Sequence, residues 1–417
     1  MTHDASDASD VSGVPKGRRL ALLEGVTVLD VTGFLAGPFA SMIFADLGAD
    51  VIKIEPIIGD TTRNNPPHFF NGDSAYFLAV NRNKRSIALN LGSPDGKAIL
   101  HRLVADADVI IDNLRAGKRE AVGVGYAELS AINPAIVSCS VTGFGSDGPY
   151  RDRPAYDIIV EALGGIMGVT GPVGGPSVRA GVPIGDITAG LYAVIGTLAA
   201  LESRRRTGHG THIDVGMLDC QVGLLSYLAQ YYFVGGVVAS HQGRAHVSIP
   251  TYNTFLCSDG VEVVVAANTQ GMWEALCGVL GRSDLRTDPR FTDRAERLRH
   301  RDDLVPLLEA GFATLKSQEA YDALVAAGVP AAPINAMDAV FDNPQVRHRD
   351  MVVEIEHRDG GNYRTLGQPI KAEESDGGAF YSAPALGGSS AQILRDAGFS
   401  SEEIAGFADR GVVVLGG

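Results

Sequence analysis

From Leu23 onward, short apolar runs alternate with amphipathic stretches, and this alternation limits the possible folds more than any other feature of the chain. The runs VTVLDVT, DVIKIE, RSIALNL, DVIIDN and AIVSCSVTGFG predict buried strands. Between them, GPFASMIFADLGA predicts a helix with Pro38 in its first turn, and SPDGKAILHRLVADA predicts a helix opened by Ser93. Strands that alternate with helices predict a parallel sheet covered on both faces, with a ligand at the carboxyl ends of the strands.

The pattern changes near residue 245, and the length of 417 residues exceeds what one ordinary core holds. The stretch TYNTFLCSDGVEVVVAAN predicts antiparallel strands around a turn, and helices follow it. The predicted fold class is α/β, with a large Rossmann-like parallel-sheet domain and a smaller α+β domain. We expect a disordered tail at 1–20, the first part of the large domain at 21–240, the small domain at 245–335, and a return to the large domain at 336–417.

Charge and composition exclude several function classes. The formal net charge of −14 disfavours binding to nucleic acid or to an anionic membrane. Neither a signal peptide nor an apolar run of membrane-spanning length is evident, and the ten histidines form no metal cluster. The four cysteines lie far apart, which indicates a reducing, cytoplasmic location without disulfides. They are Cys139, Cys220, Cys257 and Cys277.

Three short motifs resemble ligand sites, but each is better explained by ordinary structure. GFGSDG, with Gly143, Gly145 and Gly148, matches the glycine spacing of a dinucleotide fingerprint, but Pro149 and charged residues follow where a helix must open. GSPDGKA has the wrong spacing for a phosphate loop. GHGTHID has the spacing of metal ligands but is expected to be a turn that enters a strand.

Basic residues gather at two predicted strand–loop junctions. NRNKRS contains Lys84 and Arg85, and DNLRAGKRE contains Arg115. Such runs of basic residues usually lie at the surface, where solvent surrounds their charges. In an acidic protein they can equally hold a phosphorylated ligand, so both interpretations stay open at this point.

Asp186 lies between a glycine-flanked apolar turn and a long helix in GVPIGDITAGLYAVIGTLAALESRRR. Its carboxylate can cap that helix by accepting hydrogen bonds from the first backbone N–H groups, which would also favour the ionised form. It can alternatively serve as a nucleophile, with Gly185 leaving room for a substrate. The residues alone do not choose between these roles.

Several long segments, taken in order from about Leu23 to Val413, resemble the class III CoA-transferases, a family that includes the α-methylacyl-CoA racemases. The resemblance implies an interlocked-ring homodimer and a CoA thioester as substrate, with no permanently bound cofactor. The segments are LEGVTVLDVTGFLAGPFASMIFADLGADVIKIEP, GDTTR, NRNKRSIALNL, ADVIIDNLRAG, GVGYAEL, VTGFGSDGPYRDRPAYD, GDITAGLYAVIGTLAAL and RTGHGTHIDVGMLD.

The resemblance implies that Asp186 is the nucleophile, which carries CoA as an aspartyl-CoA thioester, and that Tyr156, Asp157 and Gly185 support it. A glycine-containing loop from Gly243 is a candidate to cover the site. The family's phosphate-binding basic positions fall on Pro56 and Ala121, so other cations must share that role. The predicted CoA contacts combine the positions that match the family with the basic residues that would replace its phosphate-binding cations. They are Phe34, Leu35, Ala36, Lys84, Arg85, Leu89, Asn113, Leu114 and Arg115.

Tyr156 separates the branches of the family, because the racemases carry a histidine base there and a tyrosine is a poor base for an α-proton near neutral pH. The resemblance is greatest to succinyl-CoA-dependent dicarboxylate transferases. Arg179 is then a candidate partner for the second carboxylate of the acceptor, or else a solvent-exposed loop residue. The alternatives are a 2-methylacyl-CoA racemase and a non-catalytic CoA- or nucleotide-binding protein.

Overall fold

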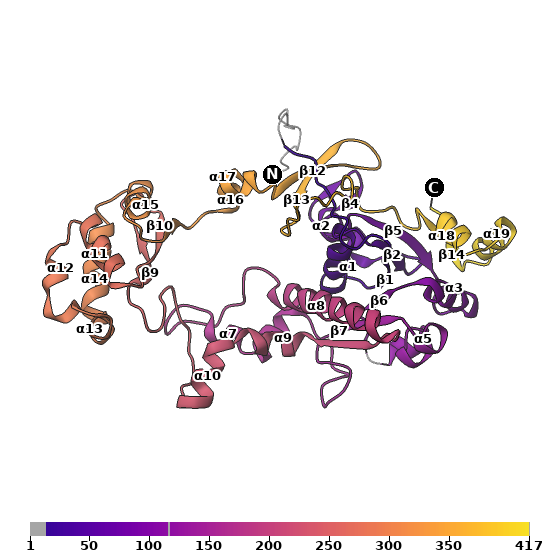
Figure 1. The fold of residues 1–417 in the computed structure, drawn as a ribbon, viewed down its shortest axis with the longest axis horizontal. Helices are drawn as coiled ribbons and strands as arrows, with labels where there is room; N and C mark the ends of the chain where they lie inside the picture. Colours follow the sequence, from indigo (N-terminus) through magenta and orange to yellow (C-terminus); the bar gives the residue numbers. More distant parts are fainter. Residues whose placement is uncertain (1–13, 116, 417) are drawn as a thin grey trace. The chain divides into compact units, whose positions relative to one another are not determined.

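The computed structural model describes residues 14–115 and 117–416, and its chain divides into two compact units (Figure 1). Over the described residues, the first unit is built from three segments, Met1–Ile166, Ala180–Ser226 and Pro344–Gly417. The second unit takes Met167–Arg179 and Tyr227–Asn343. The chain therefore leaves the first unit and returns to it at the carboxyl end.

A seven-stranded sheet in the order β14-β5-β2-β1-β6-β7-β8 forms the centre of the first unit. The strand pairs are parallel except at the edge, where β14 runs antiparallel to β5. This confirms the predicted parallel sheet. The strands are β1 Thr27–Val31, β2 Asp50–Glu55, β5 Lys84–Leu89, β6 Val109–Asp112, β7 Val137–Thr142, β8 His212–Gly216 and β14 Val413–Val414.

Helices cover both faces of this sheet (Figure 1). In β1, Val28 packs with α1 and α8, whereas Leu29 packs with α3 and α18, because successive strand side chains point to opposite faces. As predicted, Ser93 caps α3, its Oγ accepting from the Gly96 N–H at 3.0 Å. The helices are α1 Ala36–Asp46, α2 Ala75–Asn81, α3 Pro94–Asp106, α4 Lys118–Ala121, α5 Tyr126–Ile132, α6 Asp157–Leu163, α8 Ile184–Thr207, α9 Met217–Leu224, α17 Pro344–His348, α18 Ser390–Asp396 and α19 Ser401–Asp409, with a 3-10 turn η1 at Thr61–Asn64.

The first unit also carries two hairpins, and the described amino-terminal segment packs beside the longer one. Lys16 bridges to Glu354, and the Phe380 N–H donates to Gly17 O at 2.7 Å. The prediction of a disordered tail is therefore wrong for residues 14–20, because these backbone hydrogen bonds order them; residues 1–13 lie outside the described residues. The hairpin strands are β3 Phe69–Phe70, β4 Asp73–Ser74, β12 Val352–Glu356 and β13 Asn362–Leu366.

The second unit has its own core around Trp273 and a three-stranded sheet in the order β11-β10-β9. The strands β9 and β10 are antiparallel, as predicted. The unit extends beyond the expected boundaries of 245 and 335, because the Gln242 and Gly243 N–H groups bond to Val169 and Gly171 carbonyls. Its elements, with α7 and α10 at the unit boundaries, are α7 Ile166–Val169, α10 Ser226–Gly235, β9 Tyr252–Leu256, β10 Glu262–Ala266, α11 Gln270–Val279, α12 Asp284–Thr287, η2 Pro289–Phe291, α13 Arg294–Arg299, α14 Arg301–Phe312, α15 Ser317–Ala326, β11 Ala331–Pro333 and α16 Met337–Asp342.

Helix α8 is long and apolar enough to cross a membrane by length and composition alone, contrary to the expectation from the sequence. Half of its apolar window is buried inside the structure. Its Ala189 and Ala193 belong to the core that covers one face of the sheet. The apolarity of α8 is therefore that of a core helix. The four cysteines are buried and free in the structure.

Candidate functional site

The loops after β1 and β6 meet at the carboxyl edge of the sheet, where the strand order reverses around β1. The Gly33 N–H donates to Asn113 Oδ1 at 3.0 Å, and Asn113 Nδ2 donates to Gly33 O at 2.7 Å. The next residue, Phe34, has a φ of 63°, in the left-handed region that non-glycine residues seldom adopt. Such a switch point is where doubly wound sheets bind ligands. The paired loops therefore hold Phe34 at the expected ligand-binding edge.

Asp186 lies at the start of α8 and faces the start of α1. Its carboxylate accepts a hydrogen bond from the backbone N–H of Ala36, the first residue of α1. Helix α8 begins at Ile184 with Pro183 as its N-cap, so Asp186 is inside the first turn. The expectation that Asp186 caps its own helix is therefore wrong: its side chain serves the N-terminus of a different helix.

Asp157, at the start of α6, provides the cap that α8 needs. Its Oδ1 accepts from the Gly185 N–H at 2.7 Å and from the Asp186 N–H at 3.3 Å. A Cβ on Gly185 would lie 2.9 Å from that same oxygen, so a larger residue would displace the cap. One turn later, a Cβ on Gly190 would lie 2.9 Å from Ala36 O. The two glycines thus let α8 approach both α6 and α1 closely.

The environment of Asp186 makes its carboxylate unusually easy to protonate. Burial raises its pKa to about 6, and the neighbouring charge of Asp157 adds to this effect, against the lowering by the Ala36 N–H. We expected the helix N-terminus to favour the ionised carboxylate, but burial and the charge of Asp157 outweigh that effect. At neutral pH the group is still mostly ionised. A partly desolvated carboxylate of this kind can act as a nucleophile or a general base.

Two tyrosines lie near the carboxylate, and only one was predicted. Tyr156 precedes α6 and makes an edge contact with Phe34, with ring centroids 6.3 Å apart. Tyr76, on α2, was not identified from the sequence, where its setting is an ordinary helix. Burial raises the pKa of Tyr76, and the charges of Asp186, Asp60 and Asp157 raise it further, which places this phenol beside the site.

The structure brings some of the implied CoA contacts together and separates others. Phe34, Leu35 and Ala36 form the loop that leads into α1 next to Asp186, and Asn113 holds that loop. Leu114 is partly buried, and Arg115 is exposed at the same edge. Leu89 is only 1% exposed and packs in the core beneath the sheet. Its side chain therefore does not present a contact surface, which corrects the expectation for Leu89.

Lys84 is not available to bind a phosphate. Its Nζ is fully buried and donates to Asp30 Oδ2 at 3.0 Å, Asn81 Oδ1 at 2.9 Å and Pro38 O at 2.9 Å. Burial lowers the pKa of Lys84 to about 8, with the charge of Asp30 opposing the shift. The prediction of a CoA-binding role for Lys84 is therefore corrected: this lysine is part of an internal ion-pair network.

Arg85 lies at the wrong end of the sheet for the predicted role. It pairs with Ile52 near the amino ends of β5 and β2, and its Nε donates to Asp50 Oδ1 at 2.9 Å. Its guanidinium also lies 3.7 Å from Asp396. Because a ligand in this fold binds at the carboxyl ends of the strands, Arg85 is a structural ion-pair residue. Of the three basic residues that were predicted to bind phosphate, Arg115 alone is exposed at the carboxyl edge of the sheet.

GFGSDG forms a turn and GHGTHID leads into β8, as expected, whereas GSPDGKA runs into helix α3. In GFGSDG, the Gly145 N–H donates to Thr142 Oγ1 at 2.9 Å, and the next helix begins only at Asp157. His212 contacts Ser138 and Arg119. Across residues 14–115 and 117–416, no cluster of three or more His, Cys, Asp or Glu side chains is arranged to hold a metal ion.

Curated proteins similar to this chain include CoA-transferases. The human succinyl-CoA:glutarate CoA-transferase is 39% identical over 375 residues, covering 90% of this chain and 85% of that protein. The succinyl-CoA:mesaconate CoA-transferase of Haloarcula marismortui is 35% identical over 388 residues, covering 91% of this chain and 97% of that protein.

The fold and the family agree with these similarities. The crystal structure of a CAIB/BAIF family protein from Brucella suis aligns with a TM-score of 0.82 at 37% identity, covering 91% of this chain and all of that chain. The sequence profile of CoA-transferase family III matches residues 23–390, which span the Asp186 site, the second unit and every strand of the large sheet except β14. The chain therefore belongs to CoA-transferase family III and is a CoA-transferase.

Proposed function

We propose that this enzyme transfers CoA from succinyl-CoA to a dicarboxylic acid through an aspartyl-CoA thioester on Asp186. One observation carries the proposal: the Asp186 carboxylate is partly desolvated, has a pKa near 6, and faces the N-terminus of α1 at the ligand-binding edge of the sheet. Similar proteins named for succinyl-CoA and glutarate or mesaconate support the choice of substrates.

In the first half-reaction, an Asp186 oxygen attacks the thioester carbonyl, the carbon–sulfur bond breaks and CoA leaves as its thiolate. The product is a mixed anhydride between Asp186 and the donor acid. The thiolate then attacks the Asp186 carbonyl, forms the aspartyl-CoA thioester and releases the donor carboxylate. The acceptor carboxylate repeats the two steps in reverse order and restores Asp186. No proton is consumed, so the nucleophile must start ionised.

The surrounding groups suit these steps. Each tetrahedral intermediate develops an oxyanion, which preorganised N–H donors stabilise. In the first turn of α1 the Gly37 N–H can serve this role, because the start of a helix leaves such groups without intrahelical partners. The Ala36 N–H already bonds to Asp186, and Pro38 has no N–H. Asp157 does not compete for the substrate, since its Oδ1 is occupied by the Gly185 and Asp186 N–H groups. It orients α8 and thereby the nucleophile.

The covalent step is tested by mass spectrometry of the intact protein after mixing with succinyl-CoA without an acceptor. We expect an adduct of CoA lacking one water, located on Asp186 and discharged when glutarate is added. The Asp157→Asn protein is the matched control, because it keeps the nucleophile and an acceptor oxygen for the cap. An adduct that persists in Asp186→Asn at an unchanged level would contradict the proposed nucleophile.

The racemase alternative is tested with a 2-methylacyl-CoA in deuterated water. We expect no deuterium at the α-carbon when no acceptor acid is present, because Tyr156 is a poor base near neutral pH. Rapid α-deuterium uptake under these conditions would establish racemisation in place of CoA transfer.

Asp157→Asn is expected to move the acidic limb of the pH–rate profile to lower pH. The amide oxygen still accepts from the α8 N–H groups, but the negative charge that helps raise the pKa of Asp186 is gone. We therefore expect the half-maximal rate of the first half-reaction to fall below pH 6. Asp157→Ala should instead cost about 1 kcal/mol of stability through loss of the cap. An unchanged pH midpoint in Asp157→Asn would contradict this account.

Arg179 is proposed to bind the second carboxylate of the acceptor. It is exposed and lies seven residues before Asp186, and the next residue, Ala180, is anchored by its N–H to Glu161 Oε2 at 2.8 Å. A charge-assisted hydrogen bond contributes about 1.5–3 kcal/mol, or roughly 10- to 100-fold in binding. Arg179→Met should lower kcat/KM for glutarate by that factor and leave pentanoate, an acid of equal length, nearly unchanged.

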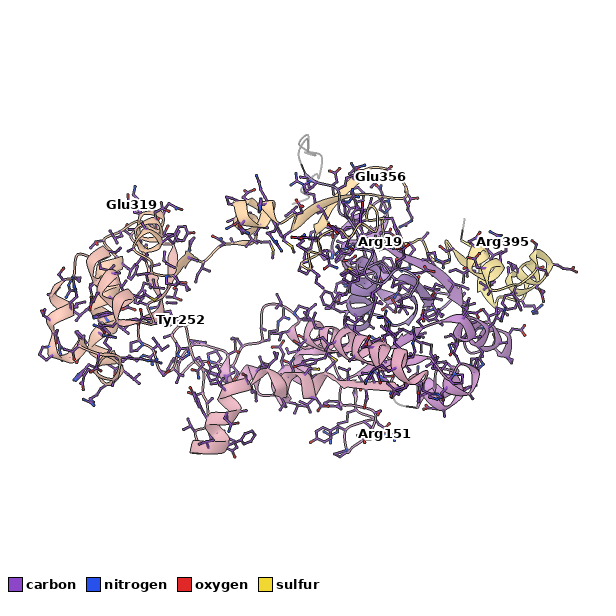
Figure 2. The ribbon with its side chains drawn as sticks, in the orientation of Figure 1. Arg19, Arg151, Tyr252, Glu319, Glu356 and Arg395 are labelled. Atoms are coloured by element: carbon purple, nitrogen blue, oxygen red, sulfur yellow. The ribbon has the colours of Figure 1, made fainter. Side chains whose placement is uncertain are left out.

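Arg151→Met is the control for Arg179, because Arg151 is a second exposed loop arginine, with half of its side chain accessible (Figure 2). It should leave both acceptors unchanged. If Arg179→Met weakened glutarate and pentanoate equally, the arginine would have no role in recognising the second carboxylate.

The proposal includes a cytoplasmic homodimer. Helices α6, α8 and α9 contact one another in the first unit, and several large apolar side chains on them are exposed. A patch of this kind on a soluble enzyme marks a protein interface. The exposed side chains are Ile158, Ile159, Leu163, Leu191, Tyr192, Ile195, Val222 and Leu224. The four reduced cysteines fit a reducing compartment.

A further inference from the structure

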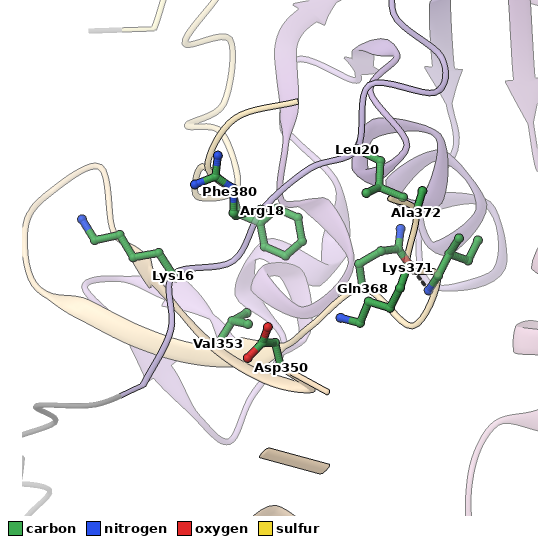
Figure 3. Close-up of a pocket in the computed structure, with 10 residues that line it drawn as sticks. Lys16, Arg18, Leu20, Asp350, Val353, Gln368, Lys371, Ala372 and Phe380 are labelled. Atoms are coloured by element: carbon green, nitrogen blue, oxygen red, sulfur yellow. Dashed lines mark hydrogen bonds between the residues drawn. The ribbon is translucent and has the colours of Figure 1, made fainter. Parts of the chain in front are cut away.

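A second pocket lies in the first unit between the amino-terminal segment and the β12–β13 region (Figure 3). Its volume is about 170 Å³, far above the ~15 Å³ that holds one water. It is smaller than the ~300–1,000 Å³ of sites for larger ligands, so it does not accommodate CoA. We call it the basic pocket; its lining is Lys16, Arg18, Leu20, Asp350, Val353, Gln368, Ile370, Lys371, Ala372 and Phe380.

Gln368 presents an unused hydrogen-bond donor in this pocket. The side chain is 5% exposed, and its Oε1 accepts from the Ile370 N–H at 3.4 Å. Its Nε2 is buried and has no hydrogen-bond partner among the described residues. A buried donor without a partner destabilises the folded state, because it has lost its hydrogen bonds to water. A ligand oxygen at this position would remove that destabilisation.

The charges at the rim favour an anion. Lys16, Arg18 and Lys371 contribute three positive charges against the single carboxylate of Asp350. Arg18 is also paired with Asp376, so part of its charge is neutralised. Burial lowers the pKa of Lys371, and an anion beside it would favour its charged form. The pocket is therefore locally positive in a chain whose net charge is −14.

The rest of the wall is apolar. Leu20, Val353 and Phe380 are buried side chains that also line the pocket. Figure 3 shows Lys16 and Lys371 at opposite ends of the pocket, with Val353 between them. A polar donor, a cationic rim and an apolar wall together match a small molecule with one anionic group and a short hydrocarbon part.

We propose that the basic pocket is a second ligand site, distinct from the Asp186 site, which binds a small organic oxyanion such as a carboxylate or phosphate ester with a short apolar part. Gln368 Nε2 and Lys371 Nζ bind the oxyanion, and Leu20 and Phe380 contact the hydrocarbon. The inference does not depend on the proposed substrates, because no residue of the Asp186 site is among those that line this pocket.

The test is isothermal titration of the full chain with butyrate, inorganic phosphate and butyramide. Lys371 is exposed, so the Lys371→Gln protein should fold normally. Gln368→Leu removes the buried donor and replaces it with a side chain of similar size. We expect butyrate or phosphate to bind the unmodified protein at least tenfold more tightly than either variant. Lys316→Gln, the same change at an exposed lysine of the second unit, should bind like the unmodified protein.

The probes separate the possible ligands. Binding of butyrate alone identifies a carboxylate ligand, and binding of phosphate with equal sensitivity to Lys371→Gln identifies a phosphorylated one. The proposal is overturned if both probes bind Lys371→Gln as tightly as the unmodified protein, if neither binds the unmodified protein, or if uncharged butyramide binds as tightly as butyrate. Lys371→Gln should leave binding at the Asp186 site unchanged. Any probe binding that is lost in this variant therefore belongs to the basic pocket.

Discussion

Asp186→Asn is expected to reduce the rate of CoA transfer by at least about 10⁴-fold, the scale seen when a catalytic nucleophile is removed. The amide has nearly the shape of the carboxylate, so the fold and the affinity for acyl-CoA should persist. The loss should therefore appear in kcat, with KM nearly unchanged. Single-turnover kinetics with succinyl-CoA and glutarate measure it directly.

The same substitution is expected to stabilise the protein at neutral pH. The folded pKa of about 6 lies above the ordinary value of 3.8, so the folded state binds the proton more tightly between these pH values. Stability contributed by the protonated form is lost as the pH rises through this window. The shift corresponds to at most about 3 kcal/mol. Asp186→Asn should recover about 1–3 kcal/mol of unfolding free energy at pH 8.

Urea unfolding at pH 5 and pH 8 distinguishes this effect from a general one. The stability gain of Asp186→Asn should shrink as the pH falls from 8 to 5, because the native carboxyl becomes protonated. A gain that is equal at both pH values would contradict the assigned pKa. A variant that is both inactive and more stable would show that the active site is held at a cost to stability.

Lys84→Met is expected to have the largest effect on stability. The lysine and Asp30 are both fully buried, and removal of one member of a buried ion pair typically costs about 3–5 kcal/mol, because the other charge is left with less compensation. Asp30 keeps its hydrogen bonds from Thr32 and Ser41 and its interaction with Lys53. These contacts place the expected loss toward the lower end, at about 3 kcal/mol, measured by chemical unfolding.

Arg115→Met is the matched comparison for Lys84→Met. Arg115 is exposed at the ligand-binding edge, so its loss should leave stability nearly unchanged and raise KM for the acyl-CoA. Lys84→Met should do the reverse, with KM unchanged at temperatures where the variant is folded. A stable Lys84→Met protein with a raised KM would restore the phosphate-binding role that the structure argues against.

The parallel sheet could be predicted from the sequence, because the pattern that defines it is local. The alternation of Val28 and Leu29 between two covered faces is visible in a run of a few residues. Ser93 as an N-cap and the turn character of GFGSDG depend on neighbours within a few positions. The boundaries of the second unit could not be predicted, since they follow from hydrogen bonds between residues near 170 and residues near 242.

A resemblance that spans nearly the whole chain also pointed to Asp186, Asp157, Gly185 and the 34–36 loop as candidate site residues. It did not reveal what these residues do to one another. Asp157 is the cap and Asp186 is not, because α6 rather than the helix's own first residues lies against the start of α8. Tyr76 was missed because only the packing of α2 brings it to the site.

Lys84 and Arg115 show what neighbouring residues in the sequence cannot predict. Both stand in short basic runs next to predicted strands, and nothing in those runs distinguishes them. The sequence by itself determined the class of fold and the family, and it singled out the carboxylate that we propose as the nucleophile, because periodicity and motifs reveal these features. The tertiary structure alone decided which charges are buried, which are paired and how far the pKa of Asp186 rises, because burial and charge pairing arise from contacts between residues distant in the chain.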